Sequence, residues 1–93
     1  MEWRVLNLGR KDGFFIQSIY EAVARAVTEE TSPNTLILIY PESPYVCIGI
    51  HQELEKEVDT DYCSRHSIPI VRRQTGGGAV YLDSLQQFYQ VII

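Results

Sequence analysis

The residues best suited to chemistry are two adjacent arginines that lead into three consecutive glycines, Arg72, Arg73, Gly76, Gly77 and Gly78. Each arginine carries a planar fork of donors that matches a carboxylate or a phosphate. The glycines allow the backbone to adopt positive φ or to approach a ligand closely. These residue types predict a main-chain cradle for a small anionic ligand. A solvated arginine pair beside an ordinary turn is the alternative that the same residues allow.

The surroundings of the glycines differ from two common phosphate-binding motifs. A P-loop places its glycines between a strand and a helix and follows them with Lys and Ser or Thr, and a dinucleotide fingerprint has the spacing G-x-G-x-x-G. Neither pattern occurs in the chain. The residues after Gly78 are strand-like, so we do not expect a phosphate at a helix N-terminus.

The length and composition limit the class of protein. A chain of 93 residues with 45% hydrophobic residues suits one small globular domain, residues 1–93. The net charge of −4 argues against nucleic-acid binding. No apolar run approaches the roughly 20 residues of a membrane span, and no signal peptide is evident, so we expect a cytoplasmic location without membrane association. The cysteines and histidines lack metal-ligand spacing, so no metal site is expected.

Apolar periodicity predicts the elements that must position the cradle. A helix is predicted where one face is formed by Ile16, Ile19, Tyr20, Val23 and Val27. Residues 35–40 are apolar on both faces and should form a buried central strand. Asp59 or Thr60 is predicted to cap a short helix that runs to about Ser67. Further strands are expected at residues 3–8, 45–50, 68–71, 79–82 and 87–93, and a charged connection at residues 53–58.

The last predicted strand runs to the end of the sequence at Ile93. Chain ends are usually polar and frayed, and a strand left there exposes an unpaired sheet edge. We therefore expect the chain to be the N-terminal portion of a longer protein. The exposed edge would also permit self-association.

The glycine segment resembles the signature of the lipoate–protein ligase A family, approximately R-R-x-x-G-G-G-A-V-[YF]-H-D. This family belongs with the biotin–protein ligases in one fold superfamily. Here the segment is Arg72-Arg73-Gln74-Thr75-Gly76-Gly77-Gly78-Ala79-Val80-Tyr81-Leu82-Asp83. Residues 46–52 resemble the family's strand and G-x-x-Q element, residues 57–62 its acidic lead into a helix, and residues 18–22 its first helix. The resemblance implies an α/β fold with a mixed, largely antiparallel sheet and two helices on one face.

The chain departs from the family pattern at two places. Leu82 stands where the family commonly has His. After Asp83, the family's Gly-Asn or Gly-Asp pair and Asn-Phe-Ser are replaced by Ser84-Leu85-Gln86-Gln87-Phe88-Tyr89-Gln90. The polar contacts of the family's His and Asn are therefore not expected from these positions, and Gln86, Gln87 or Gln90 are the residues that could substitute for them.

The resemblance implies activation of lipoate by ATP to lipoyl-adenylate, followed by transfer to a lysine of a lipoyl acceptor domain. Acceptors would be the E2 component of 2-oxoacid dehydrogenase complexes or the glycine-cleavage H protein. ATP and lipoate would be substrates, with Mg as the counter-ion of ATP in the full-length enzyme. Arg73 would lie beside the acyl carbonyl or adenylate phosphate, with Arg72 nearby. The implied lining residues are Gly76, Gly77, Gly78, Ala79, Ile48 and Gly49. Asp83 would orient Arg73 or neighbouring backbone, and a purely structural role is the open alternative for it.

No catalytic residue is expected within this chain, because the family's lysine lies beyond its end. The only lysines, Lys11 and Lys56, do not match that position. The isolated chain is therefore expected to be inactive although it carries half of an active site. Two alternatives remain open: an octanoyltransferase that uses carrier-bound octanoate, and a non-catalytic interaction fragment.

Overall fold

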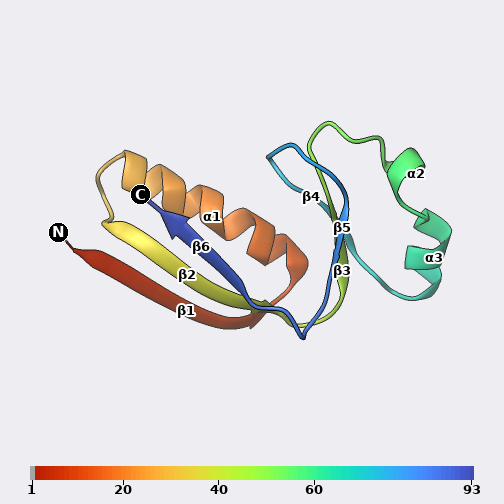
Figure 1. The fold of residues 1–93 in the computed structure, drawn as a ribbon, viewed down its shortest axis with the longest axis horizontal. Coiled ribbons are helices and arrows are strands. Elements are labelled where there is room, and N and C mark those ends of the chain that lie inside the picture. Colours follow the sequence, from red (N-terminus) through yellow and green to blue (C-terminus); the bar gives the residue numbers. More distant parts are fainter. Residues whose placement is uncertain (1) are drawn as a thin grey trace.

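The computed structural model describes residues 2–93 and contains two small sheets with three helices (Figure 1). In chain order the elements are β1 (Trp3–Lys11), α1 (Gly13–Thr28), β2 (Asn34–Pro41), β3 (Tyr45–Ile48), α2 (Leu54–Glu57), α3 (Thr60–Arg65), β4 (Ile70–Arg72), β5 (Val80–Leu82) and β6 (Phe88–Ile92).

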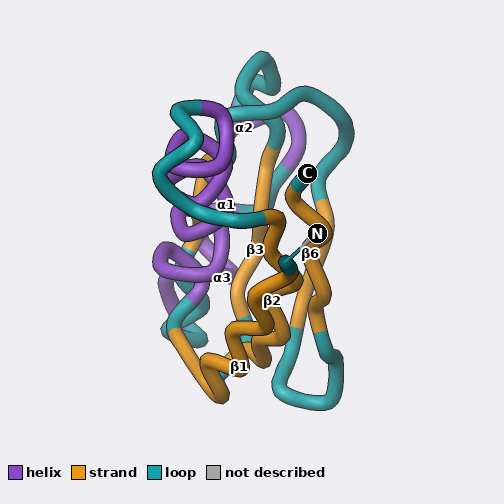
Figure 2. Tube along the Cα trace, turned by 90° about the vertical axis from the view of Figure 1, so that its left-hand side faces the viewer, coloured by secondary structure: helices purple, strands orange, loops and turns teal. Residues whose placement is uncertain are grey.

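The strands form two three-stranded sheets, with the orders β1-β2-β6 and β4-β3-β5. Each sheet contains one parallel pair and one antiparallel pair. The mixed α/β class is confirmed. Helix α1 covers one face of the first sheet (Figure 2), whereas α2 and α3 lie on the far side of the second sheet from α1 (Figure 1). The finer arrangement differs from one largely antiparallel sheet because helices connect β1 to β2 and β3 to β4. A helical crossover of this kind joins parallel strands.

Helix α1 forms where the periodicity predicts it. Asp12 is the N-cap, and its Oδ1 accepts a hydrogen bond from the Phe15 amide at 2.8 Å. This bond satisfies one of the amide donors that every helix start leaves unpaired. Ile16 and Val23 on the buried face pack against the first sheet, where Ile37 and Ile39 of β2 are fully buried. The helix is therefore held by an apolar face.

The second sheet contributes to the same core. Tyr45 and Cys47 of β3, Val71 of β4 and Leu82 of β5 join the cluster around α1. The orientation of the second sheet is thus fixed by packing on the helix that also covers the first sheet. The opposite face of the first sheet is more open, and Val5 and Val91 are more than half exposed there.

Several element boundaries differ from those expected. β1 continues past Gly9 to Lys11, because a bulge between Asn7 and Gly9 lets the strand resume its pairing with β2. The charged connection at residues 53–58 contains the short helix α2. β2 is the central strand of its sheet, as predicted, but only alternate residues are fully buried.

Within residues 2–93 no helix has the length and apolar character needed to cross a membrane.

Candidate ligand-binding site

The arginines and glycines predicted to form the cradle lie where two loops meet at one end of the second sheet. β3 and β4 are parallel, so the turn after β3 (residues 49–52, the 49–52 turn) and the loop after β4 (residues 74–79, the glycine loop) leave the sheet at the same end. The Ile50 amide donates to Thr75 O at 2.9 Å, and the Arg73 amide donates to Ile48 O at 3.0 Å. The sheet topology thus brings together segments that are more than 20 residues apart in sequence.

The guanidinium of Arg73 lies against the glycine loop itself. Its Nη2 donates to Gly76 O at 2.9 Å and to Gly78 O at 2.8 Å, and its Nη1 donates to Cys47 O at 3.4 Å. Arg73 therefore organises the loop by binding its carbonyl oxygens.

The amide nitrogens of the three loop glycines point to the ligand-binding potential of the loop. Among residues 2–93, Gly76, Gly77 and Gly78 donate no backbone hydrogen bond, and all three are exposed. An added Cβ at Gly76 or Gly78 would meet no atom within 4 Å. Consecutive amides that have no partner within the protein are able to donate to an anion or a developing oxyanion.

Two glycines are required by the geometry of the loops. Gly77 has φ +104°, which side-chain-bearing residues rarely adopt. Gly49 is buried, and a Cβ added there would collide with the backbone carbonyl of Gly77. Gly49, directly after β3, thus marks a close approach of two backbones.

Arg72 faces the other loop. Its Nη1 donates to the carbonyl oxygens of Gly49 at 3.0 Å, Ile50 at 3.1 Å and Gln52 at 2.7 Å. Gln52 closes the same turn, because its Oε1 accepts from the Gly49 amide at 2.8 Å. Gln52 was not among the predicted site residues. The G-x-x-Q spacing in the sequence was the signal for it, because this spacing lets the Gln52 side chain accept from the Gly49 amide.

The remaining predicted site residues, Ile48, Ala79 and Asp83, lie in three different surroundings. Ile48 is 1% exposed and meets the site through its carbonyl oxygen, which accepts from Arg73. Ala79 lines a cavity of about 280 Å³ with Val46 and Val80. Asp83 orients neighbouring backbone, since its Oδ1 accepts from the Leu85 amide at 2.9 Å.

The substitutions after the glycine loop have structural roles. Leu82, which replaces the family's His, is buried in the core. Gln86 holds the turn after β5, because its Oε1 accepts from the Asp83 amide at 2.7 Å. Gln90 lies in β6, opposite Ile37 of β2.

Neither lysine reaches the cradle. Lys56 pairs with Glu53 at 3.1 Å on α2, and Lys11 lies over the Phe15 ring at 5.6 Å.

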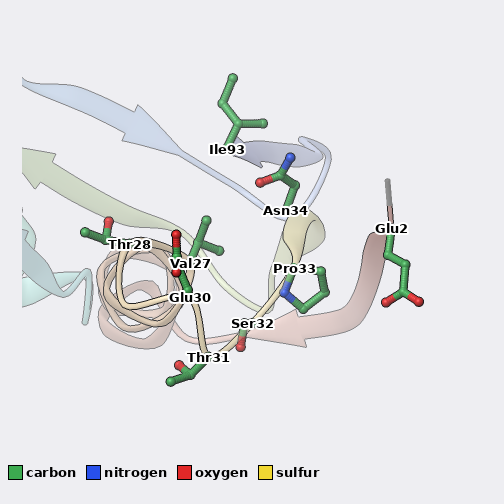
Figure 3. Close-up of a pocket in the computed structure, with 9 residues that line it drawn as sticks. All are labelled: Glu2, Val27, Thr28, Glu30, Thr31, Ser32, Pro33, Asn34 and Ile93. Atoms are coloured by element: carbon green, nitrogen blue, oxygen red, sulfur yellow. The ribbon is translucent and has the colours of Figure 1, made fainter.

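Two larger hollows lie outside the loops. One of about 610 Å³ lies beside the start of α1, between Phe14, Tyr45 and Ile70. In its wall, the Tyr45 hydroxyl accepts a hydrogen bond from Gln17 Nε2 at 2.8 Å, and burial raises the pKa of Tyr45. The other, of about 620 Å³, is lined by Glu2, Ile93 and the segment at and after the end of α1 (Figure 3). Neither is lined by a glycine of the loop.

Comparison with known proteins identifies the family. Residues 12–93 match the lipoyl protein ligase A/B catalytic domain. The octanoyltransferase LipM of Moorella thermoacetica is 36% identical over 81 residues, which are 87% of this chain and 30% of that protein. Subunit 1 of lipoate-protein ligase A from Thermoplasma acidophilum is 38% identical over 84 residues, 89% of this chain and 31% of that protein. The chain thus spans about a third of the length of these relatives.

Solved structures share the fold. A lipoate protein ligase from Thermoplasma acidophilum with bound lipoic acid has a TM-score of 0.75 and 34% identity, over 98% of this chain and 37% of that one. A lipoate-protein ligase A bound with ATP has a TM-score of 0.76 and 34% identity, over 98% and 36%. A structure of the bi-partite Thermoplasma acidophilum ligase and its E2 lipoyl domain has the same TM-score and identity, over 98% and 35%. The present chain therefore belongs to the lipoyl protein ligase A/B catalytic domain family.

Proposed function

We propose that this chain forms part of a lipoate–protein ligase active site and binds lipoate and lipoyl-adenylate at the glycine loop. The observation that carries the proposal is that the carbonyl groups and the amide groups of the glycine loop have different partners. Arg73 binds the carbonyl oxygens of Gly76 and Gly78, which leaves the glycine amides free to donate. Such donors suit the carboxylate of lipoate and the phosphate of its adenylate. Similarity to a ligase with bound lipoic acid over 98% of the chain supports the same site.

The proposed reaction has two steps. The lipoate carboxylate attacks the α-phosphate of ATP and releases pyrophosphate, and the acceptor lysine then attacks the acyl carbon and releases AMP. Oxygen charge develops at the carbonyl during the second step, and amide donors fixed beside it stabilise that charge. Arg73 acts here through the loop that it holds and adds positive potential next to the phosphate.

Magnesium would enter this site together with ATP. The groups of the cradle are amide N–H groups and a guanidinium, which bind phosphate oxygens and repel a cation. Mg would therefore be held by the ATP phosphates and by groups outside the glycine loop, and it would offset charge on the phosphates during adenylation.

The proposed acceptor is a lipoyl domain. The bi-partite relative is known with its E2 lipoyl domain, and this supports an E2-type acceptor for the protein to which this chain corresponds. The glycine-cleavage H protein is a second acceptor of the same kind. We place the activity in the cytoplasm.

Binding of a non-hydrolysable lipoyl-adenylate mimic tests the site directly. We expect saturable binding by calorimetry and at least a tenfold loss with Arg73→Ala, because both the loop shape and the local charge depend on this side chain. Arg65→Ala, at the exposed end of α3, is the matched control and should bind as the unmodified chain does. Absence of binding to the folded chain, or equal binding by Arg73→Ala, would contradict the proposal.

Acyl transfer by the chain alone should be absent. Lys11 and Lys56 lie outside the cradle, so the chain offers no lysine for the family's catalytic step. With ATP, lipoate and an apo lipoyl domain, we expect no increase in acceptor mass by mass spectrometry. Rapid modification of the acceptor would show that residues of this chain suffice.

Octanoyl transfer is the second candidate, and the 36% identity with octanoyltransferase LipM favours it. In that reaction, a thioester of a carrier protein replaces ATP and free acid as the acyl source. Competition separates the two candidates: a ligase cradle should prefer the lipoyl-adenylate mimic, whereas a transferase cradle should prefer an octanoyl thioester analogue. If the chain binds neither acyl compound yet self-associates through the edges of the first sheet, it is an interaction fragment.

A further inference from the structure

We infer that Arg72 is a positioning residue, whose guanidinium holds the 49–52 turn and through it the glycine loop. The inference rests on the proposed function insofar as the glycine loop is the ligand cradle. Arg72 differs in this from Arg73, which contacts the loop directly.

The first step of the argument is the convergence of three carbonyl groups on one nitrogen. Arg72 Nη1 lies 3.0, 3.1 and 2.7 Å from the oxygens of Gly49, Ile50 and Gln52. Carbonyl dipoles that point toward a common centre repel one another unless a cation lies between them. A guanidinium is always charged, and its hydrogen bonds are stronger than those of a neutral donor. The conformation of the turn therefore depends on this side chain.

The second step links the turn to the glycine loop. Ile50, within the turn, donates its amide to Thr75 O at 2.9 Å. Gly49 is buried, and a Cβ added there would collide with the Gly77 carbonyl, so the two backbones approach each other closely at this point. A displacement of the turn is therefore passed to the loop by one hydrogen bond and one backbone contact.

Amide hydrogen exchange tests the positioning role without a ligand. We compare the chain with Arg72→Met, which keeps the apolar stem and removes the donors, and with Arg65→Met as the matched control. We expect about tenfold faster exchange in Arg72→Met for the Ile50 amide, which bridges the two loops, and for the Arg73 amide, which bonds to Ile48 at the adjoining strand end. The amides of Ile19 and Val23 in α1 should change by less than about twofold.

Two results would overturn the inference. One is unchanged exchange at Ile50 and Arg73 in Arg72→Met. The other is a uniform increase across the chain, which would mean that Arg72 supports global stability only. If Arg72→Met does not fold, Arg72→Gln replaces it, since its neutral and shorter side chain cannot reach the three carbonyls.

Binding of the lipoyl-adenylate mimic separates this inference from the proposed function. If the mimic binds, Arg72→Met should weaken it about tenfold or more while binding remains saturable, because the donors persist but are misplaced. Unchanged affinity alongside faster local exchange would overturn the link to the cradle. If the unmodified chain does not bind the mimic, the proposed function fails, and the exchange experiment still decides whether Arg72 holds the turn.

Discussion

Two regions of this molecule are held together by different forces. The packing of α1 on the first sheet depends on apolar side chains such as Ile16 and Ile37, both fully buried. The 49–52 turn and the glycine loop are exposed for the most part and depend on arginine donors that bind backbone carbonyls. The first region follows periodic sequence patterns, whereas the second needs specific residues at single positions. The four variants below test how far this contrast extends.

The largest effect is expected in the helix-covered core. Ile37→Ala removes a fully buried side chain from the central strand and should lower the free energy of unfolding by about 2–5 kcal/mol. Urea denaturation followed by circular dichroism measures the change. Val91→Ala in the neighbouring strand is the control, because Val91 is 57% exposed, and it should cost less than about 1 kcal/mol. Equal losses would erase the contrast between the two faces of the sheet.

A smaller but still large effect is expected where the loops touch. Gly49→Ala places a methyl group against the Gly77 carbonyl, so one backbone must move, at a cost of about 1–3 kcal/mol. Gly76→Ala is the control, since its methyl group would meet open space. Thermal unfolding of both variants gives the comparison. A tolerated Gly49→Ala would mean that the loops are less tightly joined than their contact indicates.

Tyr45→Phe tests a single polar contact at the edge of the apolar core. It removes the hydrogen bond from Gln17 and should cost about 0.5–1.5 kcal/mol at pH 7, measured by urea denaturation. The Tyr45 ring itself is 1% exposed and remains packed in the variant.

The same variant has a defined pH dependence. Burial raises the pKa of Tyr45 above the ordinary value of 10.0, against a smaller lowering by the Gln17 hydrogen bond. The unfolded chain therefore loses this proton first, so stability contributed by neutral Tyr45 is complete below about pH 10 and falls as the pH rises further. The advantage of the unmodified chain over Tyr45→Phe should narrow as the pH rises above about 10. A constant or widening difference would contradict the assigned direction.

The smallest effect is expected on the surface of α2. Lys56 and Glu53 form an ion pair at 3.1 Å, but their side chains are 73% and 68% exposed. Water screens such a pair, so Lys56→Gln should change the free energy of unfolding by less than about 0.5 kcal/mol. Thermal unfolding at low and high salt measures it. A larger loss would show that polar contacts of this chain stabilise it even away from the loops.

The sequence was most informative where structure depends on local patterns. The spacing of Ile16, Ile19 and Val23 predicted α1, because residues three and four apart share a face of a helix. Asp59 was one of two predicted caps, and it accepts from the Tyr62 amide at 2.9 Å. The division into two sheets was not predicted. Strand pairing joins residues that are distant in sequence, and the residue pattern of a strand does not identify the strand with which it pairs.

The sequence by itself determined the family and the core helix, and it singled out the arginines and glycines that the fold brings to the two loops, since these depend on residue type and spacing. Only the tertiary structure decided the direction of each guanidinium. Arg72 and Arg73 are adjacent in sequence, yet one binds the carbonyls of the 49–52 turn and the other those of the glycine loop. The physical reason is the parallel pairing of β3 with β4, which places both loops at one sheet end and gives each arginine a different set of acceptors.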